Sequence, residues 1–160
     1  MIVAWPGVTP AKSICNQPVI IEDFFPTLLE LAGVDSSRRA EDLIDGMSFV
    51  NLLHGERDQA RQDRPLIWHF PNNWGPKGPG IGPSSTIRLG DWKLIYYHES
   101  QDYELFDLSK DLSETTNLAQ TLPEQKDRLA KQLGSLLRAR MAQMPTVKAT
   151  GRAVPYPGEE

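Results

Sequence analysis

The segment STIRLGDWKLIYY, residues 85–97, constrains the fold more than any other part of this sequence. Apolar and polar residues alternate on both sides of Gly90-Asp91, and such alternation is typical of strands with one buried face. A two-residue connection that begins with glycine suits a type II′ turn. The segment therefore predicts a β-hairpin whose second strand places Trp92, Leu94 and Tyr96 on one face.

Two further strands and one long helix are predicted around this hairpin. Residues 66–70 and 103–108 show the same alternation, and Pro123 opens a helix that we expect to run to about Met144. This helix has an apolar stripe that can pack on a sheet; the stripe consists of Leu129, Leu133, Leu136, Leu137 and Met141. The fold class predicted for residues 64–145 is α+β, with a small antiparallel sheet of three to four strands packed by one long C-terminal helix.

The first third of the chain has a different pattern. Residues 1–7 predict a short buried strand, and residues 24–32 predict a helix with Asp23 as its N-cap and Gly33 just past its end. A second short helix is expected over residues 49–54. One strand cannot satisfy both of its edges, so we interpret residues 1–55 as a strand and two helices left over from a larger α/β domain. Residues 56–63 are then a linker, 64–145 a C-terminal α+β subdomain, and 146–160 an irregular tail.

Composition excludes several classes of function. The formal net charge is −4 and no run of basic residues occurs, so nucleic-acid binding has no support. No apolar run approaches the length of a membrane span, and residues 1–7 do not form a signal peptide. The single cysteine, Cys15, excludes an internal disulfide.

Chemistry-bearing motifs are sparse. The three histidines are not spaced as zinc ligands, and no acidic cluster resembles a calcium or magnesium loop. No G-x-S-x-G nucleophile elbow occurs. The GPKGPGIG stretch lacks the G-K-[ST] ending of a phosphate loop, and its prolines remove the N–H groups that would bind phosphate. We therefore assign no catalytic residue and no metal ligand to residues 1–160.

Six segments in order resemble the C-terminal portion of type I sulfatases, the arylsulfatase-like family of the alkaline-phosphatase superfamily. They cover about residues 2–140 and read IVAWPGV, VIIEDFFPTLLELAGVD, DGMSFVNLLHGE, RPLIWHF, TIRLGDWKLIYY and YELFDLSKDLSETTNLA. Leu112 departs from the pattern, because the family often has proline there; this changes a turn and leaves the chemistry untouched.

The resemblance implies a sulfuric ester hydrolase whose nucleophile is a formylglycine made from the Cys or Ser of a C/S-x-P-x-R motif. It also implies a bound calcium or magnesium in the full-length enzyme, upstream of the segment that matches here. Cys15 is followed by Asn16, Gln17 and Pro18, so its proline comes one place too late and no arginine follows. We therefore expect no cofactor in this chain, a missing N-terminal catalytic domain as its partner, and no activity from residues 1–160 alone. A periplasmic or extracellular location is compatible with the resemblance.

The loop after the strand at 66–70 suggests a substrate contact. His69, Asn72, Asn73 and Trp74 supply hydrogen-bonding groups and a flat apolar ring, which suit a sugar, and the resemblance implies that loops of this subdomain line the substrate pocket. The alternative is a half-buried strand histidine and a tryptophan that covers the core. The expected substrate is a sulfated glycan or an aryl sulfate.

Two other functions remain open from the sequence. One is a non-catalytic α+β module that binds carbohydrate or protein through the Gly/Pro-rich loop. The other is a fragment of a related phosphodiesterase or phosphatase, because the residues that distinguish it from a sulfatase would lie outside the chain.

Overall fold

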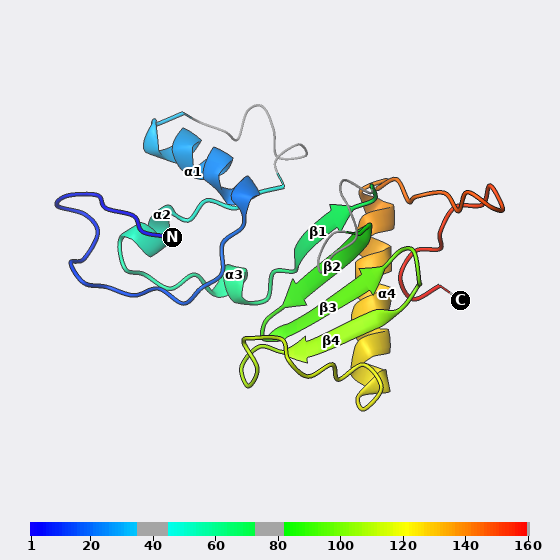
Figure 1. Cartoon of the computed structure of the whole chain (residues 1–160). Helices are drawn as coiled ribbons and strands as arrows, with labels where there is room; N and C mark the ends of the chain where they lie inside the picture. Colours follow the sequence, from blue (N-terminus) through cyan, green and yellow to red (C-terminus); the bar gives the residue numbers. More distant parts are fainter. Residues whose placement is uncertain (35–44, 73–81, 160) are drawn as a thin grey trace. The chain divides into compact units, whose positions relative to one another are not determined.

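The computed structural model describes residues 1–34, 45–72 and 82–159, and the chain divides into two compact units, Met1–Arg64 and Pro65–Glu160 (Figure 1). We call them unit 1 and unit 2, and each is described by itself. Among the described residues, no helix is both long enough and apolar enough to span a membrane.

Unit 2 contains a four-stranded antiparallel sheet, which confirms the predicted α+β class. Its strands are β1 (Leu66–Phe70), β2 (Ser84–Leu89), β3 (Trp92–Tyr97) and β4 (Tyr103–Asp107), and they lie in the order β1-β2-β3-β4. The β2–β3 register pairs Leu89 with Trp92, so Gly90 and Asp91 form the predicted two-residue turn. Gly90 has a φ of 57°, the left-handed value required at the first position of such a turn.

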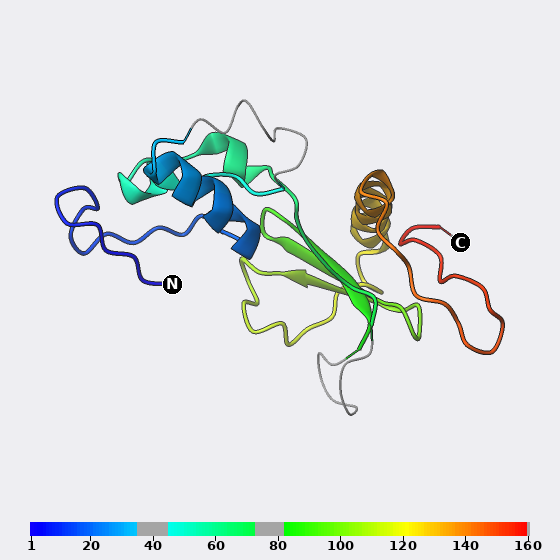
Figure 2. The same cartoon turned by 90° about the horizontal axis from the view of Figure 1, so that it is seen from above.

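The helix α4 (Pro123–Ala139) lies across one face of this sheet, as Figure 2 shows. The predicted stripe supplies Leu129, Leu133 and Leu137, which are almost fully buried against Ile87, Leu94 and Leu105 of the strands. The burial of these side chains is the main source of stability for unit 2, because each large apolar side chain removed from water contributes about 1.5–3 kcal/mol.

The helix α4 ends five residues earlier than predicted. Arg140 is its C-cap, and Met141 adopts a φ of 52° while the N–H of Ala142 donates to the carbonyl of Leu137 at 2.9 Å. This resembles the hydrogen-bonded C-terminal motif in which glycine usually occupies the left-handed position. The prediction that Met141 belongs to the apolar stripe is therefore wrong, and its side chain is 88% exposed.

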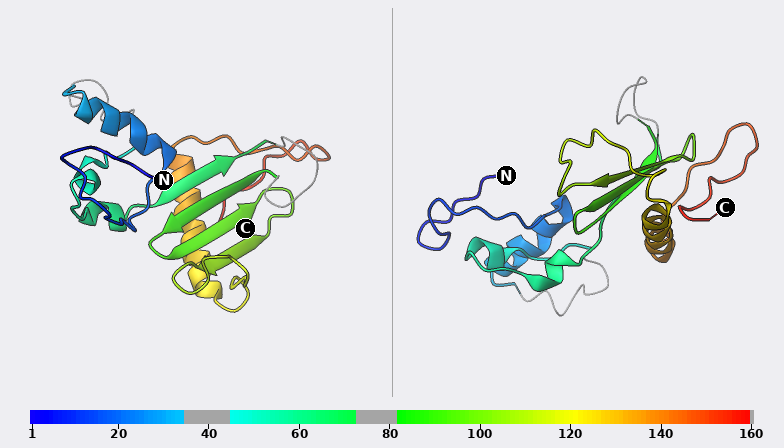
Figure 3. Two further views of the ribbon diagram at one scale, coloured as in Figure 1. Left: turned by 60° about the vertical axis from the view of Figure 1, so that its left-hand side comes forward. Right: turned by 90° about the horizontal axis from the view of Figure 1, so that it is seen from below.

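The segment after α4, residues 140–159, loops away from the end of this helix and returns, so that its last part lies beside α4 (Figure 3). It has no helix, but an isolated bridge joins Thr146 to Ala153, and Val154 and Pro157 are buried. A Cβ atom on Gly134 would lie 2.2 Å from the Pro157 carbonyl oxygen, so only glycine permits this close approach. The tail is therefore packed on α4.

Ion pairs and turn contacts cover the opposite face of the sheet. The ammonium of Lys93 donates to the Glu114 carboxylate at 2.7 Å, and the Tyr97 hydroxyl donates to Glu104 at 2.7 Å. Asp111 accepts the N–H of Thr115 at 2.8 Å, and the side chain of Glu114 pairs with Lys93.

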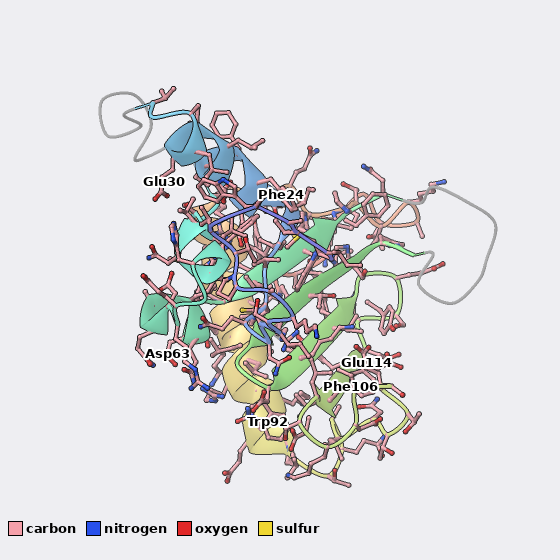
Figure 4. All side chains as sticks on the ribbon, turned by 90° about the vertical axis from the view of Figure 1, so that its left-hand side faces the viewer. Phe24, Glu30, Asp63, Trp92, Phe106 and Glu114 are labelled. Atoms are coloured by element: carbon pink, nitrogen blue, oxygen red, sulfur yellow. The ribbon has the colours of Figure 1, made fainter. Side chains whose placement is uncertain are left out.

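Unit 1 contains η1 (Ile21–Asp23) and the helices α1 (Phe24–Leu31), α2 (Val50–Leu53) and α3 (Gln59–Gln62). In α1, Phe24 lies toward the N-terminal end and Glu30 toward the C-terminal end (Figure 4). Gly33 follows this helix with a φ of 66°, as predicted. Residues 1–7 form no strand, so that prediction is wrong for this chain: a strand needs a neighbour, and residues 1–34 and 45–64 contain no strand that could pair with it.

Candidate functional site

The structure describes two of the four predicted substrate-binding residues. His69 lies on β1 and is half-buried, and Asn72 is exposed just beyond the end of that strand. Asn73 and Trp74 lie outside the described residues. The predicted group therefore remains a prediction, and the geometry can be built only around His69.

His69 belongs to a chain of hydrogen bonds on the α4 face of the sheet. Its Nδ1 lies 2.8 Å from the Oγ of Ser85, which sits directly opposite on β2, and its Nε2 lies 3.0 Å from the carbonyl oxygen of Gln143. The Ser85 Oγ lies 2.8 Å from the Nε2 of His98, just past the end of β3. One serine hydroxyl thus bridges two imidazoles.

The partners of this cluster determine the direction of each hydrogen bond. The Gln143 carbonyl can only accept, so the Nε2 of His69 carries a proton, and in a neutral ring the Nδ1 is then an acceptor. The Ser85 hydroxyl donates to that Nδ1 and accepts from the Nε2–H of His98. The Nδ1 of His98 is left without a proton, and this buried atom has no hydrogen-bond partner among the described residues.

Burial keeps His98 neutral. Its side chain is 1% exposed, and this desolvation, with a smaller contribution from the nearby His69, lowers the pKa of His98 to about 4. The rings of Tyr96 and His69 both have their centroids 5.6 Å from the ring of His98. His98 is consequently uncharged at neutral pH, and the hydrogen bonds of the cluster fix the orientation of the His69 ring.

The cluster also limits what these residues can do chemically. Ser85 is fully buried, so its hydroxyl is not open to a substrate as a nucleophile. Both ring nitrogens of His69 are already hydrogen-bonded, so a sugar hydroxyl would have to displace Gln143 or contact the ring itself. His69 is therefore held in a fixed orientation by its two hydrogen bonds.

Sequence reasoning missed Ser85 and His98 as partners of His69. The pairing of His69 with Ser85 depends on the β1–β2 register. The length of the connection between these two strands does not predict that register. The hairpin could have indicated only that residue 98 lies close to residue 83, because the His98 N–H donates to the Pro83 carbonyl at 2.9 Å.

A second polar cluster lies inside unit 1. The carboxylate of Asp23 accepts the N–H groups of Ile20 at 3.1 Å and Met47 at 2.9 Å, and one guanidinium nitrogen each from Arg61 and Arg64 at 2.7 Å. Burial alone would raise the pKa of Asp23, but the bonds from Met47 and Arg64, then Ile20 and Arg61, hold it below its usual value.

Asp23 occupies the predicted N-cap position of α1, but its side chain does not cap that helix. Its side chain makes no cap hydrogen bond to α1; it accepts the N–H of Ile20, before η1, and binds two arginines. Arg61 also donates to the carbonyls of Met47 and Ser48, both at 2.7 Å. Every oxygen of Asp23 is occupied, so this cluster holds unit 1 together and leaves no position for a ligand.

Among residues 1–34, 45–72 and 82–159, no group of three or more His, Cys, Asp or Glu side chains could hold a metal ion. The calcium or magnesium implied by the family resemblance thus has no matching ligand set in the described part of the chain. No chemical step is assigned to a metal here.

Comparison with known proteins gives a consistent result. Residues 1–143 match the family described as N-sulphoglucosamine sulphohydrolase, C-terminal. A protein named sulfatase from Formosa agariphila is 38% identical over 147 residues, which are 87% of this chain and 26% of that protein. The chain spans about a quarter of the length of the curated relatives it matches.

Two solved structures share the fold. One is described as a complex with its substrate D-glucosamine-2-N,6-O-disulfate; it has a TM-score of 0.57 and 23% identity, over 72% of this chain and 23% of that one. The other is a phosphonate monoester hydrolase of Agrobacterium radiobacter, with a TM-score of 0.52 and 26% identity, over 74% of this chain and 24% of that one.

Proposed function

The chain belongs to the sulfatase family, within its C-terminal region, and we propose on this premise that it is part of a sulfuric ester hydrolase that acts on sulfated carbohydrate. The match of residues 1–143 to that C-terminal family carries this proposal. In this account residues 1–160 contribute structure and part of the pocket wall. The nucleophile and the calcium or magnesium belong to an N-terminal catalytic domain.

The surface of unit 1 supports such a partner. Large apolar side chains of this unit are exposed, among them Ile2 at 100%, Ile14 at 87%, Leu28 at 61% and Phe25 at 59%. Exposed apolar side chains in this number on one small unit are typical of a surface that another protein segment covers. Since the relatives are about four times as long as the matched region, the proposed occupant is the N-terminal domain of the same protein.

We infer a carbohydrate substrate from the proposed pocket wall. His69 is held by Ser85 and Gln143, and Asn72 is exposed just beyond the end of β1. With Asn73 and Trp74, these residues would contact the organic part of the substrate. A sulfated amino sugar is the first candidate, because a structural neighbour of the chain is described with D-glucosamine-2-N,6-O-disulfate as its substrate.

Activity measurements test this proposal directly. We expect no hydrolysis of a chromogenic aryl sulfate by residues 1–160, and hydrolysis of a sulfated glucosamine by the longer protein in which a C/S-x-P-x-R motif precedes this region. In that protein His69→Ala should raise KM, while His54→Ala, on an exposed position of unit 1, should leave it unchanged. Turnover by the 160-residue chain alone would refute the proposal that the catalytic groups belong to the N-terminal domain.

A phosphonate or phosphate diester is the second candidate substrate. The fold likeness to a phosphonate monoester hydrolase favours it, because that enzyme shares 26% identity with the chain. Assaying the longer protein with an aryl sulfate and with an aryl phosphonate monoester of the same leaving group separates the two functions. A preference for the phosphonate would replace the sulfatase proposal.

A further inference from the structure

The strand β1 carries apolar side chains on both of its faces. Successive side chains of a strand point to opposite faces of the sheet, and Ile67 packs against the core beneath α4. The side chains of Leu66, Trp68 and Phe70 consequently lie on the outer face, by which we mean the face of the sheet turned away from α4. An antiparallel strand with one face in water normally alternates apolar and polar residues. The composition of β1 is therefore typical of a strand that is covered on both faces.

Part of the outer face is covered within the chain and part of it is not. Over β3 and β4, the ammonium of Lys93 pairs with the carboxylate of Glu114. Over β1, the side chain of Trp68 is 44% exposed, although this residue lies in the middle of the strand. The strand register places Thr86 and Ile95 in the same row as Trp68. This row is an uncharged surface with a large exposed aromatic side chain, as in the central part of many protein interfaces.

The border of this row is polar, and its charged groups are already hydrogen-bonded. On β4 the row ends at Glu104, whose carboxylate accepts the hydroxyl of Tyr97 at 2.7 Å. Two positions along β2 from the row, the guanidinium of Arg88 donates to the carbonyl of Gly90 at 3.2 Å. An uncharged centre with such a rim favours an apolar protein surface as its partner over a charged ligand.

The edges of the sheet give an independent indication. The chain closes the edge of β4 by itself, because the N–H of Leu118 donates to the Leu105 carbonyl at 2.8 Å and the Leu105 N–H donates to the Asn117 side chain at 3.0 Å. β1 forms the other edge (Figure 1). In the described part of the chain, no hydrogen bond from outside the sheet reaches the backbone of residues 66–69. β1 contains neither a charged residue nor a proline, which are the usual protections of an open edge, so this edge also calls for a cover.

The size of the relatives identifies an occupant for this surface. Residues 1–143 match a C-terminal family, and the chain spans about a quarter of the length of its curated relatives. We propose that β1 is an interface strand whose outer face and outer edge are covered by the N-terminal domain of the same protein. This inference rests on the proposed function for its partner, and it adds the surface of unit 2 that the partner contacts. Because Asn72 follows β1 closely, the contact would hold this candidate substrate residue at the boundary with the catalytic domain.

Hydroxyl-radical footprinting, read by mass spectrometry, tests the contact on the unmodified proteins. The oxidation rate of Trp68 is measured in the 160-residue chain at two concentrations and in the longer protein. We expect a severalfold lower rate in the longer protein only, because the centre of an interface excludes water. Trp92 is the matched control, since this tryptophan already packs against the core beneath α4. Its oxidation rate should be the same in all samples.

A charge on the outer face tests the same contact by hydrogen exchange. In the longer protein Trp68→Lys should accelerate the exchange of the β1 amides to the rate seen in the 160-residue chain, because a lysine ammonium in an apolar interface is costly to bury. Ser135→Lys adds the same charge to an exposed position of α4. It should leave the exchange of β1 unchanged in both proteins.

Three outcomes would overturn the proposal. One is the same oxidation rate of Trp68 in both proteins. Another is protection in the 160-residue chain that increases with its concentration, which would assign the surface to a second copy of the chain. The third is unchanged exchange of β1 in the longer protein carrying Trp68→Lys.

These measurements do not depend on turnover. A longer protein that hydrolyses sulfate esters while Trp68 stays exposed would refute only the interface. A longer protein that protects Trp68 and hydrolyses no sulfate ester would refute only the proposed function.

Discussion

The two units of the chain are built on opposite principles. Unit 2 has an apolar interior, in which Leu94, Leu105 and Leu133 are fully buried between the sheet and α4. Unit 1 buries charge, since Asp23 and Arg61 are 0% and 1% exposed, while many of its large apolar side chains face outward. Apolar burial drives folding without directional requirements, whereas a buried ion pair contributes only when all of its partners are in place.

This difference indicates what each unit needs in order to be stable. Unit 2 closes its own core and adds the packed tail, so it has the contents of a self-sufficient domain. Unit 1 depends on one carboxylate that joins Ile20, Met47, Arg61 and Arg64. The exposed apolar surface of unit 1 would contribute to stability only if another protein segment covered it. This is expected of a unit that belongs to a larger domain.

The largest predicted effect comes from Asp23→Asn. This change leaves the guanidinium groups of Arg61 and Arg64 without their carboxylate inside unit 1. Removing one partner of a buried ion pair typically costs about 3–5 kcal/mol, so we expect unit 1 to open while unit 2 stays folded. Hydrogen exchange of residues 20–34 and 45–64, compared with that of α4, measures the two separately.

Glu30→Gln is the matched control, because Glu30 is an exposed acid on α1. It should leave the exchange rates of both units unchanged. Equal acceleration in α4 and in unit 1 on Asp23→Asn would mean that the units unfold together, and the contrast drawn above would then be wrong.

Acid should affect unit 2 before it affects the ion cluster of unit 1. The pKa of His98 is about 4 in the folded chain and near 6.5 when unfolded, so the unfolded chain binds a proton first as the pH falls. Unit 2 therefore loses about 3 kcal/mol between pH 6.5 and pH 4, an order-of-magnitude figure from the pKa difference. The contribution of Asp23 is also lost on acidification but over a lower pH range: it is present above the usual carboxyl pKa and is lost as the pH falls below it.

The free energy of unfolding of β2 and β3 is measured by hydrogen exchange in urea at several pH values. Its change with pH gives the predicted slope. His98→Gln removes the titrating ring and should flatten it between pH 6.5 and pH 4. His54→Gln, which changes an exposed histidine of unit 1, should leave the slope intact. A wild-type slope in His98→Gln would assign the pH dependence to another group.

The sequence predicts unit 2 better than unit 1, for a physical reason. The hairpin follows from contacts between neighbours in the chain, namely Gly90-Asp91 and the alternation around them. The stripe of Leu129, Leu133 and Leu137 likewise repeats within one helix. The early end of α4 was missed because the left-handed Met141 is stabilised by hydrogen bonds that glycine normally makes, and methionine gives no such signal.

Long-range polar partnerships were not predictable from one sequence. Asp23 meets Arg61 across 38 positions and Arg64 across 41, and nothing in the spacing distinguishes these arginines from the others. His69 was identified from its place at the base of a loop, but its partners Ser85 and His98 depend on strand register. Local patterns specify elements, whereas the site depends on which elements meet.

The smallest expected change in stability comes from the exposed apolar surface of unit 1. Phe25 and Leu28 are 59% and 61% exposed on α1, so the double change Phe25→Ser and Leu28→Ser removes little buried area. We expect the free energy of unfolding of the 160-residue chain to change by less than about 1 kcal/mol, since substitutions away from the core usually have small effects. Self-association, measured by sedimentation velocity, should decrease.

In the longer protein the same change should lower stability strongly, because there the two side chains would be covered. A large loss already in the 160-residue chain would show that unit 1 buries these residues by itself, and the contrast between the units would then lie only in their buried charges.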